Sequence, residues 1–242
     1  MARGHPDYGA SGAISTIASV QDLGELAARL GSIVTFDRRG NVILADSFED
    51  TLSAWSNVTT GTGASVAQSN DSARSGQYSA KLVTGNLNGD YAYISGVRSI
   101  AVLGKLGLEV SFNGPSSTER WTIGLQLFTG AKQVIAQATI EGASTAFTIV
   151  TTGGVTHELT LPYALYVGTK SFHTLKLVAD FSAQTWTRLL LDSNSYDLSA
   201  LGLYVLDSST LPALNAQIQL TALSDASKTR YVDDVIITQN EL

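Results

Sequence analysis

The sequence predicts an all-β protein, a jelly-roll β-sandwich of two antiparallel sheets preceded by an N-terminal arm. From residue 46 onward, short runs rich in Val, Ile, Thr and aromatic residues follow one another with partly alternating polarity. About a dozen such runs are present, more than the roughly seven strands of an immunoglobulin domain. No helical pattern of useful length interrupts them, which favours two sheets packed face to face. The absence of a repeat with a fixed period argues against propellers and solenoids.

Turn-forming residues separate the predicted strands. The clearest strand runs are QYSAKLVT, YAYISGV, LGLEVSFN, WTIGLQLF, QVIAQATI, TAFTIVT, THELTL, FHTLKLVADF, TWTRLLLD, LGLYVL, NAQIQLTAL and TRYVDDVIIT. Between them lie Asn113-Gly114-Pro115, Thr129-Gly130-Ala131, Gly153-Gly154 and Asp192-Ser193-Asn194, which are sequences typical of tight turns. The sandwich is therefore expected to occupy residues 46–242.

Residues 1–45 differ from the rest and are predicted to form a docking arm. Residues 1–18 are small and polar, which predicts extended chain. The segment SVQDLGELAARLG predicts a helix over about 19–30, with Ser19 as N-cap and Gly31 ending it. Alternating runs on both sides of the turn 37–41 predict a β-hairpin over about 32–45.

The predicted helix is too short to be stable alone in water, so its apolar face must be buried against something. Either the sandwich or another chain could cover it. We expect an assembly interface formed by apolar side chains of the helix and of the first hairpin strand, namely Val20, Leu23, Leu26, Leu30, Ile33, Val34 and Phe36.

Composition excludes several classes of function. The net charge is −6 and the pI about 5.0, whereas a nucleic-acid interface needs clustered Lys and Arg. The chain has no Cys, so disulfides and thiolate chemistry are excluded. No apolar run approaches the roughly 18 residues of a membrane span, and the N-terminus has no secretory signal pattern.

Charged residues make up 15% of the chain, well under the roughly 25% usual for soluble domains. Neutral polar residues on the outer faces of a β-protein would explain this value. A surface partly covered by partners would explain it equally well, because buried interfaces contain few charged residues.

Four stretches resemble carbohydrate-binding-module jelly rolls. They are SFEDTLSAW, SARSGQYSAKLVTG, SFHTLKLVADFSAQTWTRLLLDSNSYDL and the closing TRYVDDVIIT. The likeness spans about residues 46–238 and is strongest at the two ends.

The resemblance implies a structural calcium ion where the two ends of such a domain meet. Glu49 in the first strand and Asp233 or Asp234 in the last would supply carboxylates, and the Ser75-Gly76 turn would supply carbonyls. Calcium binds about six to eight oxygens of these kinds. The alternative is that Glu49 and Asp50 are turn residues and that Asp233 pairs with Arg230 or caps a turn.

The resemblance also suggests glycan binding, which requires an aromatic platform for sugar rings with polar groups around it. Tyr91 and Tyr93 share one face of a predicted strand and are the candidate stacking pair, although they could equally be a packing pair. Other aromatic residues are scattered, namely Trp121, Tyr163, Tyr166, Trp186 and Tyr204. Trp55 and Trp121 have apolar neighbours and are expected in the core.

No catalytic pattern is visible. None of the three histidines has a partner at metal-ligand spacing, and no Gly-x-Ser-x-Gly elbow is present. A glycosidase needs two facing carboxylates, whereas Glu109, Glu119, Glu141 and Glu158 are isolated in the sequence. We therefore expect no enzyme and no catalytic cofactor.

The arm followed by a sandwich resembles the layout of virion structural proteins of tailed bacteriophages. This resemblance implies a non-enzymatic capsid decoration, head-fibre or tail-appendage subunit on the surface of a phage particle. Its partners would be copies of itself, as a homotrimer or another closed ring, and other capsid or tail proteins. The alternative is a carbohydrate-binding module for attachment to a host surface or polysaccharide, and neither hypothesis involves nucleic acid or a membrane.

Overall fold

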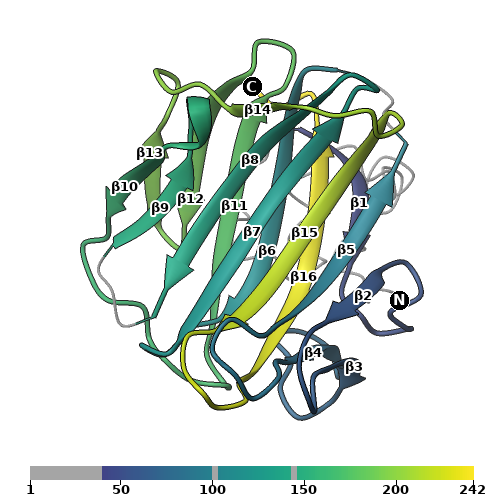
Figure 1. The fold of residues 1–242 in the computed structure, drawn as a ribbon, viewed down its shortest axis with the longest axis vertical. Helices are drawn as coiled ribbons and strands as arrows, with labels where there is room; N and C mark the ends of the chain where they lie inside the picture. The colour runs from purple at the N-terminus through teal and green to yellow at the C-terminus, as the bar shows by residue number, and fades with distance from the viewer. Residues whose placement is uncertain (1–39, 100–102, 143–145) are drawn as a thin grey trace, which may run out of the picture.

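The computed structural model describes residues 40–99, 103–142 and 146–242 (Figure 1). The predicted extended segment, the predicted helix and all seven predicted assembly residues, Val20 to Phe36, lie outside these ranges and remain predictions. The described part of the predicted hairpin is β1 (Asn41–Asp46), which pairs antiparallel with the last strand of the chain.

The described residues form two antiparallel sheets of eight strands each, and the prediction of a jelly-roll β-sandwich is confirmed. The back sheet has the order β13-β12-β11-β6-β16-β4-β3, with β1 also paired to β16. Its strands are β1 (Asn41–Asp46), β3 (Ser65–Ser69), β4 (Ser79–Val83), β6 (Lys105–Asn113), β11 (Phe172–Asp180), β12 (Thr185–Leu191), β13 (Asn194–Asp197) and β16 (Thr229–Gln239).

The front sheet lies nearer the viewer in Figure 1 and has the order β10-β9-β8-β7-β15-β5-β2, with β14 also paired to β8. Its strands are β2 (Ser56–Thr59), β5 (Tyr91–Arg98), β7 (Glu119–Phe128), β8 (Lys132–Glu141), β9 (Ala146–Val150), β10 (Thr156–Thr160), β14 (Tyr204–Asp207) and β15 (Ala213–Ala222). Within the described ranges, the 3-10 turn η1 (Thr152–Gly154) is the one helical element.

Alternation along each front-sheet strand sends apolar side chains toward the back sheet. In β15, Leu214, Ala216, Ile218 and Leu220 are buried in the core, and the residues between them point the other way. The indole of Trp121 on β7 is fully buried and donates a hydrogen bond of 2.8 Å to the carbonyl of Asn113. Burial of such a polar ring requires a partner of this kind, so Trp121 is a core residue, as the sequence predicts.

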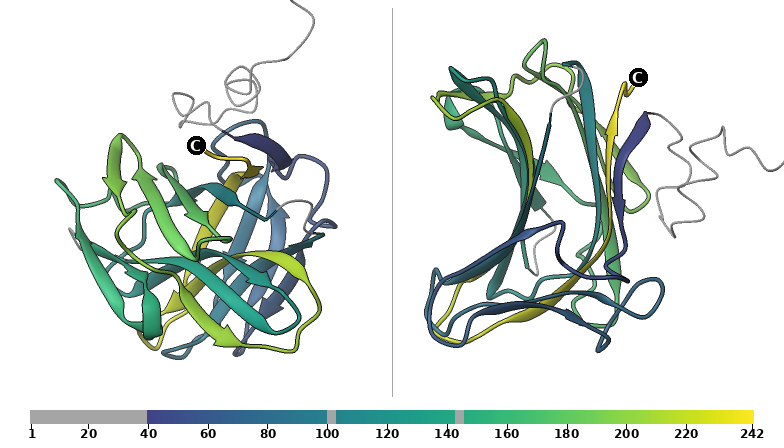
Figure 2. Two further views of the ribbon diagram at one scale, coloured as in Figure 1. Left: turned by 90° about the horizontal axis from the view of Figure 1, so that it is seen from above. Right: turned by 90° about the vertical axis from the view of Figure 1, so that its right-hand side faces the viewer.

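The front sheet is curved, and its hollow side faces away from the back sheet (Figure 2, right). The outer side of the back sheet is partly closed by the C-terminal residues. Glu241 is buried there between Lys176 (3.0 Å) and Arg188 (2.6 Å). Within the described ranges, no strand covers the hollow side of the front sheet.

One buried ion pair links the two sheets at an end of the sandwich. The guanidinium of Arg230 on β16 lies 2.7 Å from the carboxylate of Glu119 at the start of β7, and both residues are buried. The backbone N–H of Ser116 also donates to this carboxylate, at 2.8 Å. The alternative that Arg230 pairs with Asp233 is therefore wrong.

Replacing Glu119 with Leu should destabilise the fold by about 3–5 kcal/mol, because it leaves a buried guanidinium without its carboxylate. Adding Arg230→Met should restore most of the loss, since the double variant has no buried charge at this position. Urea unfolding followed by tryptophan fluorescence measures both values. Asp207→Ala removes an exposed ion pair with Lys132 and serves as a control that should change stability little. A loss below about 1 kcal/mol for Glu119→Leu would show that this pair does not hold the sheets together.

Candidate functional site

The hollow side of the front sheet is lined by polar side chains from its four central strands, β5, β7, β8 and β15. We call the side chains of these strands that point away from the back sheet the outer face. Their positions are fixed by strand pairing, in which Gln219 lies between Thr122 on β7 and Tyr93 on β5. One row along the strands, Thr221 lies between Arg120 and Tyr91.

A chain of side-chain amides runs across the outer face. Gln133 donates to Gln126 (3.1 Å), Gln126 donates to Gln217 (2.9 Å), and Gln217 donates to Gln219 (3.0 Å). Gln219 then donates to the hydroxyl of Thr221 (3.0 Å). A carboxamide has two N–H donors and an oxygen with two lone pairs, so each central amide keeps one donor and one lone pair for a ligand. We call this chain the amide ladder.

Tyr91 and Tyr93 lie at one end of the amide ladder. Their ring centroids are 5.8 Å apart and their planes are inclined by 25°, so the rings are stacked along β5. Ala92 and Ile94 on the same strand are fully buried in the core, which places both tyrosines on the outer face, half-buried. The structure thus brings the predicted stacking pair beside hydrogen-bonding groups, and its binding of a glycan stays a prediction.

Of the remaining candidate aromatic residues, Tyr204 on β14 lies directly opposite Ile135 of β8, on the same side of the sheet as the outer face, and the others lie elsewhere. Trp55 and Trp121 are buried, as expected. Trp186 is buried too, and its indole donates to the Val150 carbonyl at 3.0 Å, so it offers no ring to a ligand. Tyr163 and Tyr166 are exposed in the loop between β10 and β11.

A hollow of about 370 Å³ lies at the edge of the outer face, where β8, β9 and β10 run side by side. Glu141 of β8 and Glu158 of β10 both line it. Arg120, beside Glu141 on the neighbouring strand, lies 3.3 Å from the Glu141 carboxylate. The view that these glutamates are isolated is therefore wrong, because strand order brings two of them to one hollow.

The predicted calcium residues also come together, and a bulge in β16 is the reason. Its register with β6 shifts between Asp233 and Ile236, and Asp234 has a positive φ of 45°. Bulges redirect side chains in this way, so both carboxylates face the loop between β3 and β4. Gly76 in that loop has φ 61°, and the Glu49 carboxylate occupies the space where a Cβ would lie.

Nitrogen donors engage most of these carboxylate oxygens. Asp233 accepts backbone N–H groups of Arg74 (2.7 Å) and Ser75 (3.1 Å). Asp234 accepts the Arg74 guanidinium (2.6 Å) and the Ser75 hydroxyl (2.8 Å). Glu49 accepts the N–H groups of the two residues that follow Gly76, both at 2.9 Å. In this arrangement Arg74 supplies the positive charge, and a calcium ion would have to displace it.

Burial, together with the neighbouring charge of Asp234, raises the pKa of Asp233 to about 7, although three backbone N–H groups oppose the rise. Between about pH 4 and 7 the folded state therefore keeps a proton that the unfolded chain has lost. The contribution of Asp233 to the free energy of unfolding is fully present below about pH 4 and decreases as the pH rises to about 7. A cation bound here would oppose that decrease.

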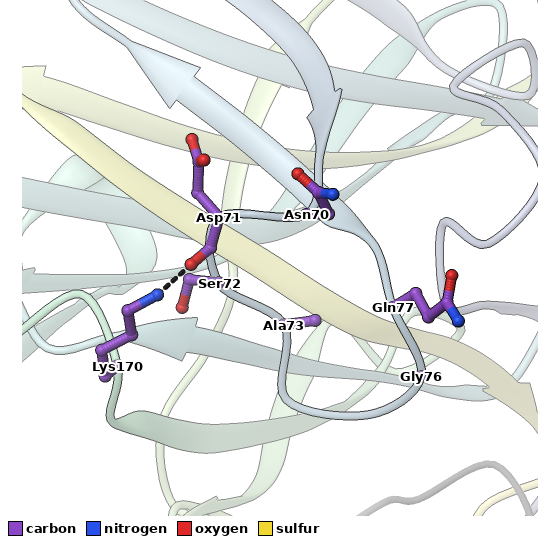
Figure 3. A pocket seen from close by; sticks show the side chains of 7 residues that line it. All are labelled: Asn70, Asp71, Ser72, Ala73, Gly76, Gln77 and Lys170. Carbon is purple, nitrogen blue, oxygen red and sulfur yellow. Dashed lines mark hydrogen bonds between the residues drawn. The ribbon is translucent and has the colours of Figure 1, made fainter.

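A second hollow, of about 420 Å³, lies beside this cluster (Figure 3). Lys170 donates to the carbonyl of Asp71 across it, and the Asp71 carboxylate accepts from Lys81 (2.6 Å) and from the hydroxyl of Tyr231 (3.3 Å). No aromatic ring lines this hollow, so it lacks the platform that sugar stacking needs. We assign the Lys170, Lys81 and Tyr231 contacts of Asp71 to the structure of the loop.

Neither a metal-binding group of side chains nor a helix able to cross a membrane is found in the part of the chain that the structure describes. No group of three or more His, Cys, Asp or Glu side chains there could hold a metal ion, and Glu49, Asp233 and Asp234 do not form such a group. Calcium therefore stays a prediction from the resemblance. In the same ranges, no helix has the length and apolar character needed to cross a membrane.

Comparison with known proteins finds no matching family model and no matching curated protein. Among solved structures, the endo-β-1,4-glucuronan lyase of the fungus Trichoderma reesei is similar over 82% of this chain and 96% of its own (10% identity, TM-score 0.59). The β-glucanase of Bacillus licheniformis is similar over 81% and 97% (10% identity, TM-score 0.51). The CBM22-1 xylan-binding domain of Paenibacillus barcinonensis Xyn10C aligns over 84% and 97% (12% identity, TM-score 0.40).

The first two of these comparisons show the jelly-roll β-sandwich fold, and both are with glycan-cleaving enzymes. They give no support to a virion origin. They also correct the expectation that this chain is not an enzyme, because a lyase and a glucanase share its fold over nearly their full length. The lack of a catalytic motif along the sequence does not exclude catalysis on such a scaffold.

Calcium should stabilise the Arg74→Ala variant more than the unmodified chain, because the variant removes the guanidinium that binds the Asp234 carboxylate, next to Asp233. The measurement is the midpoint of thermal unfolding at pH 7.5, after chelator treatment and after addition of millimolar calcium. Magnesium, which demands a tighter octahedral shell, is the control and should have a smaller effect. An unchanged midpoint in both proteins on addition of calcium would contradict the calcium prediction.

Proposed function

We propose that this chain binds an extended glycan along the hollow outer face of the front sheet. The observation that carries the proposal is the position of the stacked Tyr91–Tyr93 pair at one end of the amide ladder. Sugars present C–H groups on their ring faces and hydroxyls around their edges. An aromatic pair beside ordered amides offers a partner to both kinds of group.

The amide ladder suits hydroxyl recognition because its orientation is fixed before a ligand arrives. Each of Gln126, Gln217 and Gln219 both donates to and accepts from a neighbouring side chain, so the amides cannot rotate without losing a bond. Preorganised donors lose less conformational freedom on binding than free side chains do. The ladder crosses from β8 through β7 to β15, so several sugars of one chain could contact it in turn.

The fold supports the proposal, because a glucuronan lyase and a β-glucanase, both named for glycan substrates, share the sandwich. The proposal is compatible with a subunit of a virion appendage that attaches to a surface polysaccharide, and equally with a free binding module. The assembly arm of residues 1–45, the homotrimer and the particle location stay predictions. Both settings would use the same face for the glycan.

Tyr93→Ala should weaken glycan binding by about tenfold, because the stacked ring is lost, and Tyr91→Ala in addition should weaken it further. Affinity electrophoresis against neutral polysaccharides of several linkages identifies a ligand, and titration calorimetry measures the loss. Tyr166→Ala is the matched control, since Tyr166 is the most exposed tyrosine of the β10–β11 loop and lies off the outer face. Binding that survives both outer-face variants and disappears with Tyr166→Ala would move the site to that loop.

A second candidate function is cleavage of the bound glycan, and the shared hollow of Glu141 and Glu158 favours it. Hydrolysis of a glycosidic bond uses one carboxyl group as acid and a second as base or nucleophile. The expected result is that new reducing ends appear in the bound polysaccharide. The rate of their appearance should be at least about a hundredfold lower in Glu158→Gln. Binding without new reducing ends, at high protein concentration and over long incubation, would limit the chain to recognition.

A further inference from the structure

The outer face carries very little charge, and this feature bears on the class of glycan that it can accept. Among the outward-pointing side chains of β5, β7, β8 and β15, Arg120 is the one cation and Glu141 the one anion. The remaining polar groups are amides, hydroxyls and tyrosine rings. Glu158, at the edge of the face, adds a second carboxylate.

The single cation is paired with the single anion. The Arg120 guanidinium lies 3.3 Å from the Glu141 carboxylate, and the two occupy directly paired positions on β7 and β8. A polyuronate carries one carboxylate on each sugar, and binding it requires cations, most effectively arginine side chains that bind carboxylates with two parallel hydrogen bonds. With one guanidinium and two carboxylates, this part of the surface has a net charge of −1.

We propose that the outer face selects uncharged glycans over polyuronates, and that Glu141 sets this selectivity by neutralising Arg120. This inference rests on the proposed function and specifies its substrate class. It distinguishes the chain from the glucuronan lyase that shares its fold, since that enzyme is named for an acidic glycan. Like charges placed together across an interface exclude the wrong partner, and the chain's overall charge of −6 acts in the same direction.

The test compares two pairs of hexasaccharides, each with one charged and one uncharged member that differ in the group at C6. One pair is the β-1,4-glucan and β-1,4-glucuronan hexamers, which differ only at C6. The other pair is the α-1,4-galacturonan hexamer and its methyl ester. Titration calorimetry at low salt should give at least about tenfold tighter binding of the uncharged member, and the ratio should decrease at about 0.5 M salt as the charges are screened.

Glu141→Gln should narrow that ratio by about threefold or more, because it removes one negative charge and releases the Arg120 guanidinium for a carboxylate. Asp207→Asn is the matched control. It releases Lys132 from an ion pair of 2.6 Å whose two residues point away from the outer face, and it should leave the ratio unchanged.

Each outcome has a definite meaning. A charged member that binds as tightly as its uncharged counterpart, with binding still lost in Tyr93→Ala, would overturn the selectivity and leave the proposed function standing. An affinity ratio that Glu141→Gln and Asp207→Asn change equally would overturn the role of Glu141. Absence of binding by all four hexasaccharides would overturn the proposed function and the selectivity together.

Discussion

Burial of one face of the front sheet against the back sheet is the constraint on which the candidate site depends. Because side chains alternate along a strand, packing Leu214, Ala216, Ile218 and Leu220 into the core forces the residues between them to the opposite face. The same constraint acts on β5, β7 and β8. The amide ladder and the tyrosine pair are thus positioned by the hydrophobic core beneath them, and a register slip of one residue in any of these strands would bury them.

The outer surfaces of the two sheets differ in the kind of side chain that they carry. On the back sheet, ionic side chains are buried, and Glu241 joins Lys176 and Arg188 into one cluster. On the curved front sheet, neutral amides and a hydroxyl form a hydrogen-bonded chain on the side that faces away from the back sheet. A low overall content of charged residues, 15%, is consistent with a large neutral surface of this kind. Of the two explanations that the composition leaves open, the described residues provide direct examples of the first.

Much of the fold could be predicted from the sequence because alternation is a local signal. The segment ALNAQIQLTA shows which residues of β15 are buried, and YAYIS places Tyr91 and Tyr93 on one face. Sheet order is not local. Nothing in the sequence indicates that β15 lies between β7 and β5, and the amide ladder depends on that order. The pairing of β8 with β9 and of β9 with β10, which brings Glu141 and Glu158 to one hollow, is hidden for the same reason.

The resemblance to carbohydrate-binding modules predicted which residues at the ends of the sandwich lie near one loop, but it did not predict which groups they bind. Glu49, Asp233 and Asp234 all bind the loop that contains Gly76, yet Arg74 binds Asp234, and Arg230 binds Glu119 instead of Asp233. Each of these ion pairs joins residues more than a hundred positions apart, so sequence spacing carries no information about them. Trp186 illustrates the same limit, because its strand pattern does not reveal that its indole is buried against the Val150 carbonyl.

The most direct test of the account is to map where a neutral hexasaccharide binds, by following side-chain amide signals in ¹H–¹⁵N NMR spectra during a titration. The account predicts that the carboxamide signals of Gln126, Gln217 and Gln219 shift together and saturate. The signal of Gln68 on β3 of the back sheet, whose amide donates to the Phe48 carbonyl at 2.6 Å, should stay in place. Shifts confined to residues outside β5, β7, β8 and β15 would contradict the central claim that the outer face of the front sheet is the glycan site.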